Sequence, residues 1–534
     1  MKLRQTNIEK LRKGTFDVLI IGGGINGAVA AAALAGKGVK VALIDKGDFA
    51  GHTSSNSSNL AWGGIKYLEN MELLLVNKLC RSRNHLMRAY PSTVKEIRFF
   101  TTIAKGFRLP TWFIFMGTLF YWALGRFFTK PPRYLSKSTI EQEEPAVNTA
   151  NARGGFEYSD CYLYDNDARF VFNFIRTGLN YGCVATNYVA SIGAERHQDH
   201  WQVMAEDQIS GEQFPVRAKV LINACGPFVD AHNRLSHENT EHHHLLSKGI
   251  HLIIDQVTKE PRVLTFFASD GRLFFVIPMG RKTCIGTTDA PVTTPEPEVT
   301  EADREFVLNN INALLKLPKP ITKDDIIAER CGVRPLAVKG EGGEADWIKL
   351  SRKHAIDVDE ANQHISIFGG KLTDCLNVGE EVVDRVKAMA IPISFPDHRW
   401  YGEPDDSVKQ EFLHQAKLMD LDSYTDPISS EPLTERFWRR YGAEAIGLLE
   451  RIRQDPSSTR LLIENAEYTR CEIEQAARRE VIVKLEDFLR RRSKISQVVR
   501  TEDLRKAPGL REACKILFED QADEKYEEYF REHS

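Results

Sequence analysis

A glycine-rich turn between two short β-branched runs constrains this chain more than any other feature of its sequence. Residues 16–45 read FDVLIIGGGINGAVAAAALAGKGVKVALID. The run 18–21 predicts a strand buried on both faces, the alanine-rich run 28–35 a helix, and residues 39–44 a second strand. This order predicts a βαβ unit and therefore a sheet with a parallel centre.

Three glycines in this turn, Gly22, Gly24 and Gly27, have the spacing of a dinucleotide-binding site. Gly22 permits the tight turn, Gly24 lets a pyrophosphate approach the backbone, and Gly27 lets the helix pack closely on the strand. The free amides of the helix face the phosphates. Asp45 closes the second strand about twenty residues on, where a carboxylate accepts hydrogen bonds from an adenosine ribose. An ordinary glycine-rich turn is disfavoured because all these parts follow in order.

Length, charge and cysteine usage exclude several classes of protein. The 534 residues exceed what one hydrophobic core usually organises, so we expect two or three domains. Contents of 42% hydrophobic and 27% charged residues are typical of a soluble or peripheral globular protein. The net charge of −3 argues against a nucleic-acid partner. The cysteines show no metal-ligand spacing and the first 13 residues no secretory signal, which favours reduced thiols and a cytoplasmic location.

Small polar side chains follow Asp45. Residues 51–59, GHTSSNSSN, offer many donors that can approach phosphate and flavin closely. Serine and asparagine also dominate ordinary turns, so a plain surface loop is the alternative. Two later strands end in small residues in a similar way, at 223–227 (NACGP) and at 364–373 (HISIFGGKLT). The glycine pair of the second would supply backbone amides to the anionic end of a ligand.

Residues 109–125, LPTWFIFMGTLFYWALG, are the most membrane-like segment of the chain, with basic residues on both sides. As a helix they would reach only about 25 Å at 1.5 Å per residue, and they contain Pro110 and Gly117, which disfavours a full span. Trp112, Trp122 and the flanking cations are typical of an interfacial anchor. A buried core helix or a hydrophobic hairpin is the alternative.

The remaining sequence divides into a β-rich part and a helical part. Alternating aromatic patterns over 249–289 predict an antiparallel sheet, and residues 405–534 are charged and predict an appended helical domain. Residues 72–89 predict a helix whose basic residues, Arg83 among them, lie on a solvated side. The histidine cluster in 239–244 lacks an acidic or cysteine ligand pattern, so we predict no metal site.

With these motifs in order, the sequence resembles the FAD-dependent glycerol-3-phosphate dehydrogenases over nearly its whole length. The motifs that carry the resemblance are IIGGGINGA at 20–28, TSS and SS at 53–58, GG-x-x-YLE at 63–69, GFEYSDC at 155–161, NA-x-GP at 223–227, KG-x-H at 248–251, IGTTD at 285–289, GVRPL at 332–336, FGGKLT at 368–373, RRYG at 439–442 and LEDFLRRRSK at 485–494.

The resemblance implies an α/β (α+β) fold with a Rossmann-like FAD-binding βαβ domain, an antiparallel-sheet substrate domain and a C-terminal α-helical domain. The oxidoreductase region would cover residues 14–404, with FAD-binding segments at about 14–70, 155–230 and 360–390, substrate-domain segments at about 71–154 and 231–359, and the helical domain at 405–534.

The resemblance also implies site residues. Those that would bind FAD are Gly22, Gly24, Gly27, Asp45, Ser54, Ser55, Ser58, Val189, Ala224, Gly226, Gly369 and Gly370. Arg334, Lys371 and His251 would be catalytic: the cations suit a phosphate dianion or a developing alkoxide, and the imidazole can take the hydroxyl proton. Surface ion pairs for the cations and a core imidazole for the histidine are the alternatives.

The reaction implied is hydride transfer from sn-glycerol 3-phosphate to flavin, which gives dihydroxyacetone phosphate, with electrons passed on to a quinone. The resemblance further implies peripheral, monotopic attachment to the cytoplasmic face of the cell membrane, here through residues 109–125. A homodimer is among the assemblies it allows.

The chain departs from the family pattern close to the implied substrate site. Tyr67 matches, but Trp62 and Lys66 stand where the family has histidine and arginine, Asn59 replaces a lysine, and Cys225 replaces a threonine. Lysine lacks the planar fork of arginine, and an indole cannot accept a proton. A different polyol phosphate, hydroxy acid or amine therefore stays open as substrate, as does a catalytically silent, membrane-associated flavin-binding protein.

Overall fold

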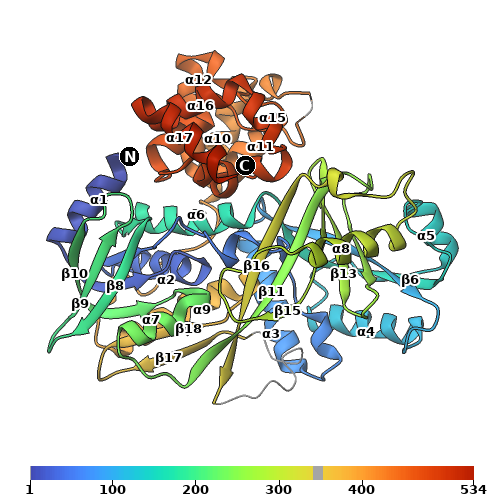
Figure 1. The fold of residues 1–534 in the computed structure, drawn as a ribbon, viewed down its shortest axis with the longest axis horizontal. Helices are drawn as coiled ribbons and strands as arrows, with labels where there is room; N and C mark the ends of the chain where they lie inside the picture. The colour runs from blue at the N-terminus through green and yellow to red at the C-terminus, as the bar shows by residue number, and fades with distance from the viewer. Residues whose placement is uncertain (1, 341–352, 428, 534) are drawn as a thin grey trace. The chain divides into compact units, whose positions relative to one another are not determined.

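The computed structural model describes residues 2–340, 353–427 and 429–533 (Figure 1). The chain forms two compact units. The first consists of Met1–Ser55, Asp165–Ser247 and Val333–Ser534, and the second of Asn56–Tyr164 and Lys248–Gly332. The predicted domain boundaries stay a prediction, and the part of the predicted substrate segment at 341–352 lies outside the described residues.

A sheet with a parallel centre organises the first unit. Its strands run in the order β17 (Ala355–Asp359), β18 (His364–Phe368), β10 (Gln213–Asn223), β1 (Thr15–Ile21), β2 (Val41–Ile44) and β7 (Val184–Thr186), and β9 (Trp201–Asp207) joins β10 to β8 (Val189–Arg196). Ile20 on β1 lies between Leu43 and Ile222 of its parallel neighbours. The predicted buried strand 18–21 is confirmed, and the second strand starts at Val41 rather than at residue 39.

Helices cover this sheet. The alanine-rich helix α2 (Ile25–Gly36) is buried along nearly its whole length, as the small side chains predict, because it packs against both α6 (Asp167–Asn180) and α9 (Cys375–Ala388). The predicted helix at 28–35 is therefore confirmed. Its first turn follows the end of β1 directly, so the glycine pattern lies at the carboxyl end of the central strand.

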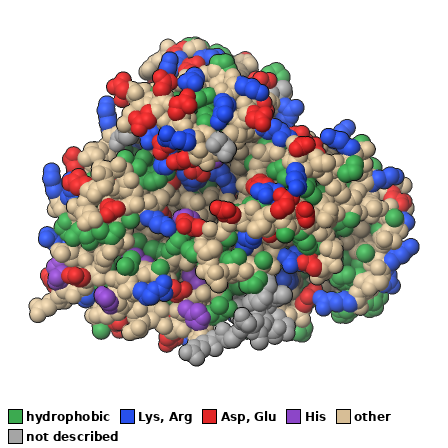
Figure 2. Space-filling model, in the orientation of Figure 1, with side chains coloured by type: hydrophobic (Ala, Val, Ile, Leu, Met, Phe, Trp, Pro, Cys, Tyr) green, Lys and Arg blue, Asp and Glu red, His purple; other side chains and the backbone are tan. Residues whose placement is uncertain are grey.

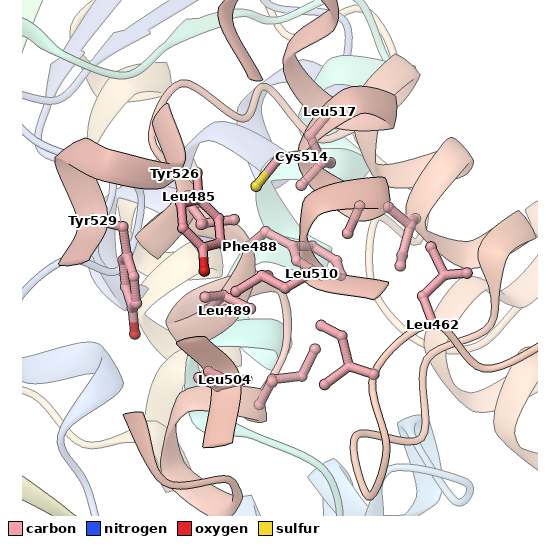
Figure 3. Packing of buried hydrophobic residues seen from close by; sticks show 14 of the residues in the cluster. Leu462, Leu485, Phe488, Leu489, Leu504, Leu510, Cys514, Leu517, Tyr526 and Tyr529 are labelled. Carbon is pink, nitrogen blue, oxygen red and sulfur yellow. The ribbon is translucent and has the colours of Figure 1, made fainter. Parts of the chain in front are cut away.

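The C-terminal part of the first unit is helical, as predicted for 405–534. Its helices are α10 (Asp406–Leu418), α11 (Leu433–Tyr441), α12 (Ala445–Gln454), α13 (Arg470–Arg479), a π-helix (Asp487–Arg492), α14 (Ile495–Val498), α15 (Thr501–Lys506), α16 (Pro508–Phe518) and α17 (Ala522–Glu532). An apolar cluster that includes Phe488, Leu489 and Leu510 forms one core of this part (Figure 3). Acidic and basic side chains are interspersed on the face of this part that Figure 2 shows.

The second unit is built on a largely antiparallel sheet. β11 (His242–Asp255), β14 (Lys282–Gly286), β13 (Leu273–Met279) and β12 (Val263–Phe267) pair in antiparallel fashion, which confirms the prediction for 249–289. β12 then pairs in parallel with β4 (Val94–Ala104), and β4 pairs antiparallel with β6 (Ala152–Leu163). The helix α8 (Glu301–Leu314) contributes Val307 and Ile311 to the apolar cluster under this sheet.

The apolar segment at 109–125 forms the helix α4 (Thr111–Leu124) of the second unit. No helix in the described ranges is long and apolar enough to cross a bilayer. Trp112 is 62% exposed and Phe113 52% exposed, while Tyr121 on the opposite side is buried. The alternative of a buried core helix is therefore wrong, because α4 turns its largest apolar side chains to solvent.

Candidate active site

The glycine turn after β1 has no room for side chains. Gly22 has a φ of +104°, and a Cβ there would lie 2.5 Å from the Ala224 carbonyl oxygen. A Cβ on Gly27 would lie 1.8 Å from the Gly22 carbonyl oxygen. Two glycines of the motif are thus required for β1, α2 and β10 to come together, as a dinucleotide-binding turn needs.

The small polar loop predicted at 51–59, here called the serine loop, reaches the N-terminus of α2 through Ser54. Gly24 is the N-cap residue and has no side chain to cap the helix, and the Ile25 N–H donates to Ser54 Oγ at 3.0 Å. Ser54 therefore lies where the motif places a pyrophosphate. Ser55 is buried, and its hydroxyl donates to the His52 carbonyl oxygen at 3.1 Å, within the same turn.

Asp45 ends β2 next to the glycine turn, as predicted. Its Oδ2 accepts the Gly23 N–H at 2.6 Å and its Oδ1 accepts the Gly47 N–H at 2.8 Å. Burial raises the pKa of this carboxyl to about 6, although both amide hydrogen bonds act in the other direction. Val189 takes part through its backbone, since its N–H donates to the Asp45 carbonyl oxygen at 2.7 Å.

The small residues after β10 meet the same turn. Ala224 donates its N–H to the Ile21 carbonyl oxygen at 2.9 Å, and a Cβ on Gly226 would meet no atom within 4 Å, so there is space beside it. Cys225 is half-buried, and burial raises the pKa of its thiol, which keeps the thiol protonated.

An aromatic cluster beside this turn was missed by the sequence analysis. The ring of Phe228 lies 4.9 Å from that of His52, centroid to centroid, and Lys46 Nζ lies 3.5 Å from the Phe228 centroid. The only sequence signal was position: Lys46 follows Asp45, and Phe228 follows the NACGP turn.

The Gly369–Gly370 turn after β18 is held by two side chains that were not predicted. The Gly369 N–H donates to His244 Nε2 at 2.9 Å, and Asn26 Nδ2 donates to the Gly369 carbonyl oxygen at 2.9 Å. Burial lowers the pKa of His244 to about 4, so the imidazole is neutral and can accept. The Gly369 amide is thereby committed to His244 and is not directed at a ligand.

Lys371 and Arg334, the predicted cations, both belong to the first unit. Lys371 follows Gly370 directly and is half-buried, and Arg334 is half-buried on β16 (Ala328–Lys339). The residue before Arg334 accepts a hydrogen bond of 2.7 Å from Thr53 Oγ1 through its carbonyl oxygen. The serine loop and the GVRPL strand are therefore in contact, as two parts of one site should be.

The segment after Lys371 is anchored by a buried histidine that the sequence analysis did not single out. His354 Nδ1 lies 3.0 Å from Asp374 Oδ2, and its Nε2 lies 3.0 Å from Glu381 Oε2. The hydrogen bond from His354 helps to lower the pKa of Glu381 to about 2. His354 thus joins the residue before β17 to Asp374 and to Glu381 of α9.

The other predicted residues belong to the second unit. His251 is 2% exposed on β11, opposite Gly286 of β14, where a Cβ would lie 2.9 Å from His251 Cδ2. Trp62 donates its indole N–H to the Tyr158 hydroxyl at 3.2 Å. Tyr67 is buried in the short helical turn Ile65–Leu68, whereas Lys66 is exposed. Ser58, predicted to bind FAD, is half-exposed in this unit.

A buried carboxylate supports the Trp62 segment. Asp160 Oδ1 accepts the Gly63 N–H at 3.0 Å and the Arg83 guanidinium at 3.0 Å, and Oδ2 accepts the Tyr121 hydroxyl at 2.8 Å. The prediction of a solvated basic side for residues 72–89 is therefore wrong at Arg83, which is 1% exposed. The Arg83 guanidinium lies in the interior because its charge compensates that of the buried Asp160 carboxylate.

The histidine cluster provides a trio with metal-ligand geometry. Ligand atoms of Glu241, His242 and Asp357 lie within 4.8 Å of one another. His242 Nδ1 lies 2.6 Å from Asp357 Oδ1, and Lys339 Nζ lies 2.6 Å from Glu241 Oε2. Glu241 thus contacts Lys339, and Asp357 contacts His242.

The glycine turn, the helix N-terminus, the space beside Gly226 and the Asp45 carboxylate together fit FAD. They place a helix N-terminus and small hydroxyls where the motif binds phosphates, and one carboxylate where it binds a ribose. Gly22, Gly24, Gly27, Asp45, Ser54, Ser55, Val189, Ala224, Gly226, Gly369 and Gly370 all lie in the first unit.

Comparisons with known proteins agree with this fit. Residues 17–347 match the family described as FAD dependent oxidoreductase, and residues 410–517 match the C-terminal domain of alpha-glycerophosphate oxidase. Glycerol-3-phosphate dehydrogenase 2 of Mycobacterium tuberculosis is 30% identical over 498 residues, which cover 91% of this chain and 82% of that protein. A glycerol-3-phosphate dehydrogenase of Synechocystis is 28% identical, with 99% and 98% covered.

Solved structures show the same fold. The glycerol-3-phosphate dehydrogenase of Bacillus halodurans, complexed with FAD, matches with a TM-score of 0.72 at 24% identity, covering 99% of this chain and 97% of that one. L-alpha-glycerophosphate oxidase of Mycoplasma pneumoniae, with FAD bound, matches with a TM-score of 0.55 at 16% identity over 72% of this chain and 98% of that one.

Asp45 is expected to make FAD binding depend on pH. Above about pH 6 the carboxylate can accept ribose hydroxyl hydrogen bonds, and below it the proton removes that capacity, so FAD affinity should fall as the pH drops from 7 to 5. Asp45→Asn should weaken FAD binding about 10- to 100-fold at pH 7, as expected when a charged hydrogen bond worth about 1.5–3 kcal/mol is lost, and should flatten the pH dependence. Titration of apoprotein with FAD, followed by flavin fluorescence, measures both.

Asp17→Asn is the matched control, because Asp17 pairs with Lys219 on the surface and lies away from the glycine turn. It should leave the pH profile unchanged. An Asp45→Asn protein whose FAD affinity still falls below pH 6, in parallel with the parent, would contradict the assignment.

Proposed function

We propose a function for this chain from its family: it belongs to the glycerol-3-phosphate dehydrogenases, within the FAD-dependent oxidoreductases. It oxidises sn-glycerol 3-phosphate to dihydroxyacetone phosphate. The observation that carries the proposal is the intact cradle for a dinucleotide at Gly22, Gly27 and Asp45 in a chain that aligns with such dehydrogenases over most of its length.

The chain's own residues divide the chemistry between binding and proton transfer. When bound, FAD supplies the hydride acceptor. Arg334 and Lys371 bind the anionic parts of the substrate and favour the developing alkoxide. His251 accepts the hydroxyl proton at a ring nitrogen as the C–H bond breaks, so that the secondary alcohol becomes a ketone. His251 is buried on β11.

Trp62 and Lys66 keep a second candidate in view, an oxidoreductase of the same fold with another polyol phosphate, a hydroxy acid or an amine as substrate. The indole of Trp62 is engaged with Tyr158, and Lys66 is exposed. Neither reproduces what a histidine and an arginine would offer at these positions.

We also propose that quinone receives the electrons and that α4 holds the protein at the cytoplasmic face of the membrane. Support comes from α4 and its flanks, where Trp112, Phe113, Met116, Phe120 and Phe127 are all exposed. Exposed apolar patches of this kind mark interaction surfaces, and aromatic rings with nearby cations suit the lipid headgroup level. A quinone dissolved in the bilayer would then be within reach.

Anaerobic addition of sn-glycerol 3-phosphate to the purified flavoprotein should bleach the flavin absorbance band. Lys371→Ala should slow the bleaching about 10- to 100-fold, because a charged contact worth about 1.5–3 kcal/mol in the transition state is lost. Lys219→Ala, a surface lysine paired with Asp17, should bleach at the parental rate. Stopped-flow absorbance gives the rates.

Bleaching of the Lys371→Ala protein at the parental rate would show that this lysine has no role. If glycerol 3-phosphate does not bleach the parental protein, although dithionite reduces it, the result favours the second candidate, an oxidoreductase with another substrate. Other anionic alcohols are then the next substrates to test.

Replacing Trp112 and Phe113 with serine should release the protein from membranes. Burial of each exposed ring in lipid would contribute about 1.5–3 kcal/mol to membrane binding, and serine loses this contribution. Co-sedimentation with vesicles that contain anionic lipid measures the loss. Serine at Phe395 and Leu418, which are at least as exposed and lie on the first unit, is the control and should not change binding. Unchanged sedimentation of the Trp112/Phe113 variant would refute the anchor.

A further inference from the structure

We propose that the C-terminal helical domain is part of the cofactor site: Arg490, Arg491 and Arg492, here called the arginine segment, hold the FAD-binding loops in their binding conformation. The three are positioning residues, because they act through other residues rather than by touching the cofactor. The inference rests on the FAD site and not on the identity of the substrate.

The first contact of the arginine segment is with Asp48, three residues after Asp45. Arg492 binds both carboxylate oxygens of Asp48, with Nη1 2.8 Å from Oδ2 and Nη2 2.8 Å from Oδ1. Arg491 Nε adds a third hydrogen bond of 2.6 Å to Oδ2. Since all three side chains are buried, the loop that begins with Asp45 is held by a bidentate charge pair in the interior.

The charge state of Asp48 agrees with this geometry. Burial acts to raise the pKa of Asp48, but the charges of Arg492 and Arg491 outweigh burial and hold the pKa below its ordinary value. Asp48 is therefore ionised at neutral pH. Asp48 Oδ1 also accepts a hydrogen bond of 2.8 Å from Asn187, the residue after β7.

The second contact of the arginine segment is with the serine loop. Arg490 Nη2 donates to the Ser55 carbonyl oxygen at 2.9 Å. Ser55 follows Ser54, whose hydroxyl accepts the first amide of α2. The segment therefore contacts the chain on both sides of residues 49–54, between the ribose carboxylate and the phosphate end of the site.

A third path leads to the strand beside Asp45. Tyr188 donates its hydroxyl to Asp487 Oδ1 at 2.6 Å, and Arg491 Nη2 donates to the same oxygen at 2.7 Å. The next residue, Val189, pairs its backbone with Asp45. Three parts of the FAD site are thus joined to one π-helix of the C-terminal domain.

That π-helix is itself fixed. Phe488 and Leu489 lie between the start of the π-helix and the arginine segment. Both are buried in the apolar cluster of the C-terminal domain (Figure 3). The arginine segment follows them at the end of the π-helix Asp487–Arg492. The arginine segment therefore directly follows residues that are packed in the core of the C-terminal domain.

A second set of buried ion pairs in the same domain allows a role in FAD binding to be distinguished from a role in stability alone. Arg439 Nη1 lies 2.7 Å from Asp165 and also pairs with Glu431. Arg439 is nearly as buried as Arg492, but its partners Asp165 and Glu431 precede α6 and α11 and lie outside residues 45–55, which Arg490 to Arg492 hold. Loss of either arginine should destabilise the protein, and only loss of Arg492 should loosen FAD.

The physical reason is preorganisation. A loop that is held in its binding conformation before the ligand arrives loses no further conformational entropy on binding, whereas a loosened loop must be ordered at the expense of affinity. FAD affinity should therefore depend on residues more than 430 positions away in sequence from the loop they hold, since Asp48 and Arg492 are 444 residues apart.

The test compares Arg492→Gln with Arg439→Gln in the full-length protein. Apoprotein of each is titrated with FAD, the dissociation constant is read from flavin fluorescence, and the visible circular dichroism of the bound flavin reports its environment. Arg492→Gln should raise the dissociation constant about 10- to 100-fold and alter the dichroism, while Arg439→Gln should change the constant less than about threefold despite a comparable fall in the apoprotein's Tm. Equal weakening by both variants, or none by Arg492→Gln, would overturn the proposal.

Two further variants cover an Arg492→Gln protein that does not fold. Arg490→Gln removes the contact with Ser55 from a half-buried position and should still weaken FAD about threefold to tenfold. Arg492→Lys keeps the charge without the bidentate fork and should restore part of the affinity. Unchanged FAD affinity in Arg490→Gln would count against the proposal. None of these readouts uses substrate, so a failure of the proposed dehydrogenase activity leaves them interpretable.

Discussion

The close approach of β1, α2 and β10 at Gly22 and Gly27 is the constraint on which the rest of the first unit depends. The absence of two Cβ atoms lets the helix start at the carboxyl end of the central strand. Every other part of the FAD site is arranged around that point. Asp45 bonds to the Gly23 amide, Ser54 reaches the first amide of α2, and Asn26 holds the Gly369 turn.

Buried charges hold the segments around the sites. In the first unit Asp48 is bound by Arg491 and Arg492, and in the second Asp160 is bound by Arg83 and the Tyr121 hydroxyl. Each carboxylate would be costly alone, and each is compensated by a guanidinium and further hydrogen bonds. Such pairs specify one arrangement of the chain, because a shifted loop would leave a charge uncompensated in the interior.

Much of the fold could be predicted because the signals are local. The β-branched run before Gly22, the alternating aromatics from 249 to 289 and the charged helical pattern after 405 each specify an element within a few residues of itself. Prediction failed where the environment decides: Arg83 has the composition of a solvated face and lies inside, because Asp160 needs a counter-charge. His244 and Asn26, which hold the Gly369 turn, carried no pattern that marked them as part of a site.

The βαβ unit, the cofactor class and the family can be recognised from local sequence alone, since glycine spacing and the strand-end carboxylate follow from backbone sterics and short-range hydrogen bonding. Which distant side chains hold that unit in place follows from the folded chain and not from any local pattern. The partners Asp48 and Arg492 are 444 residues apart, and His244 is 125 residues from Gly369. Such pairings depend on how the chain folds back on itself, and no local periodicity records them.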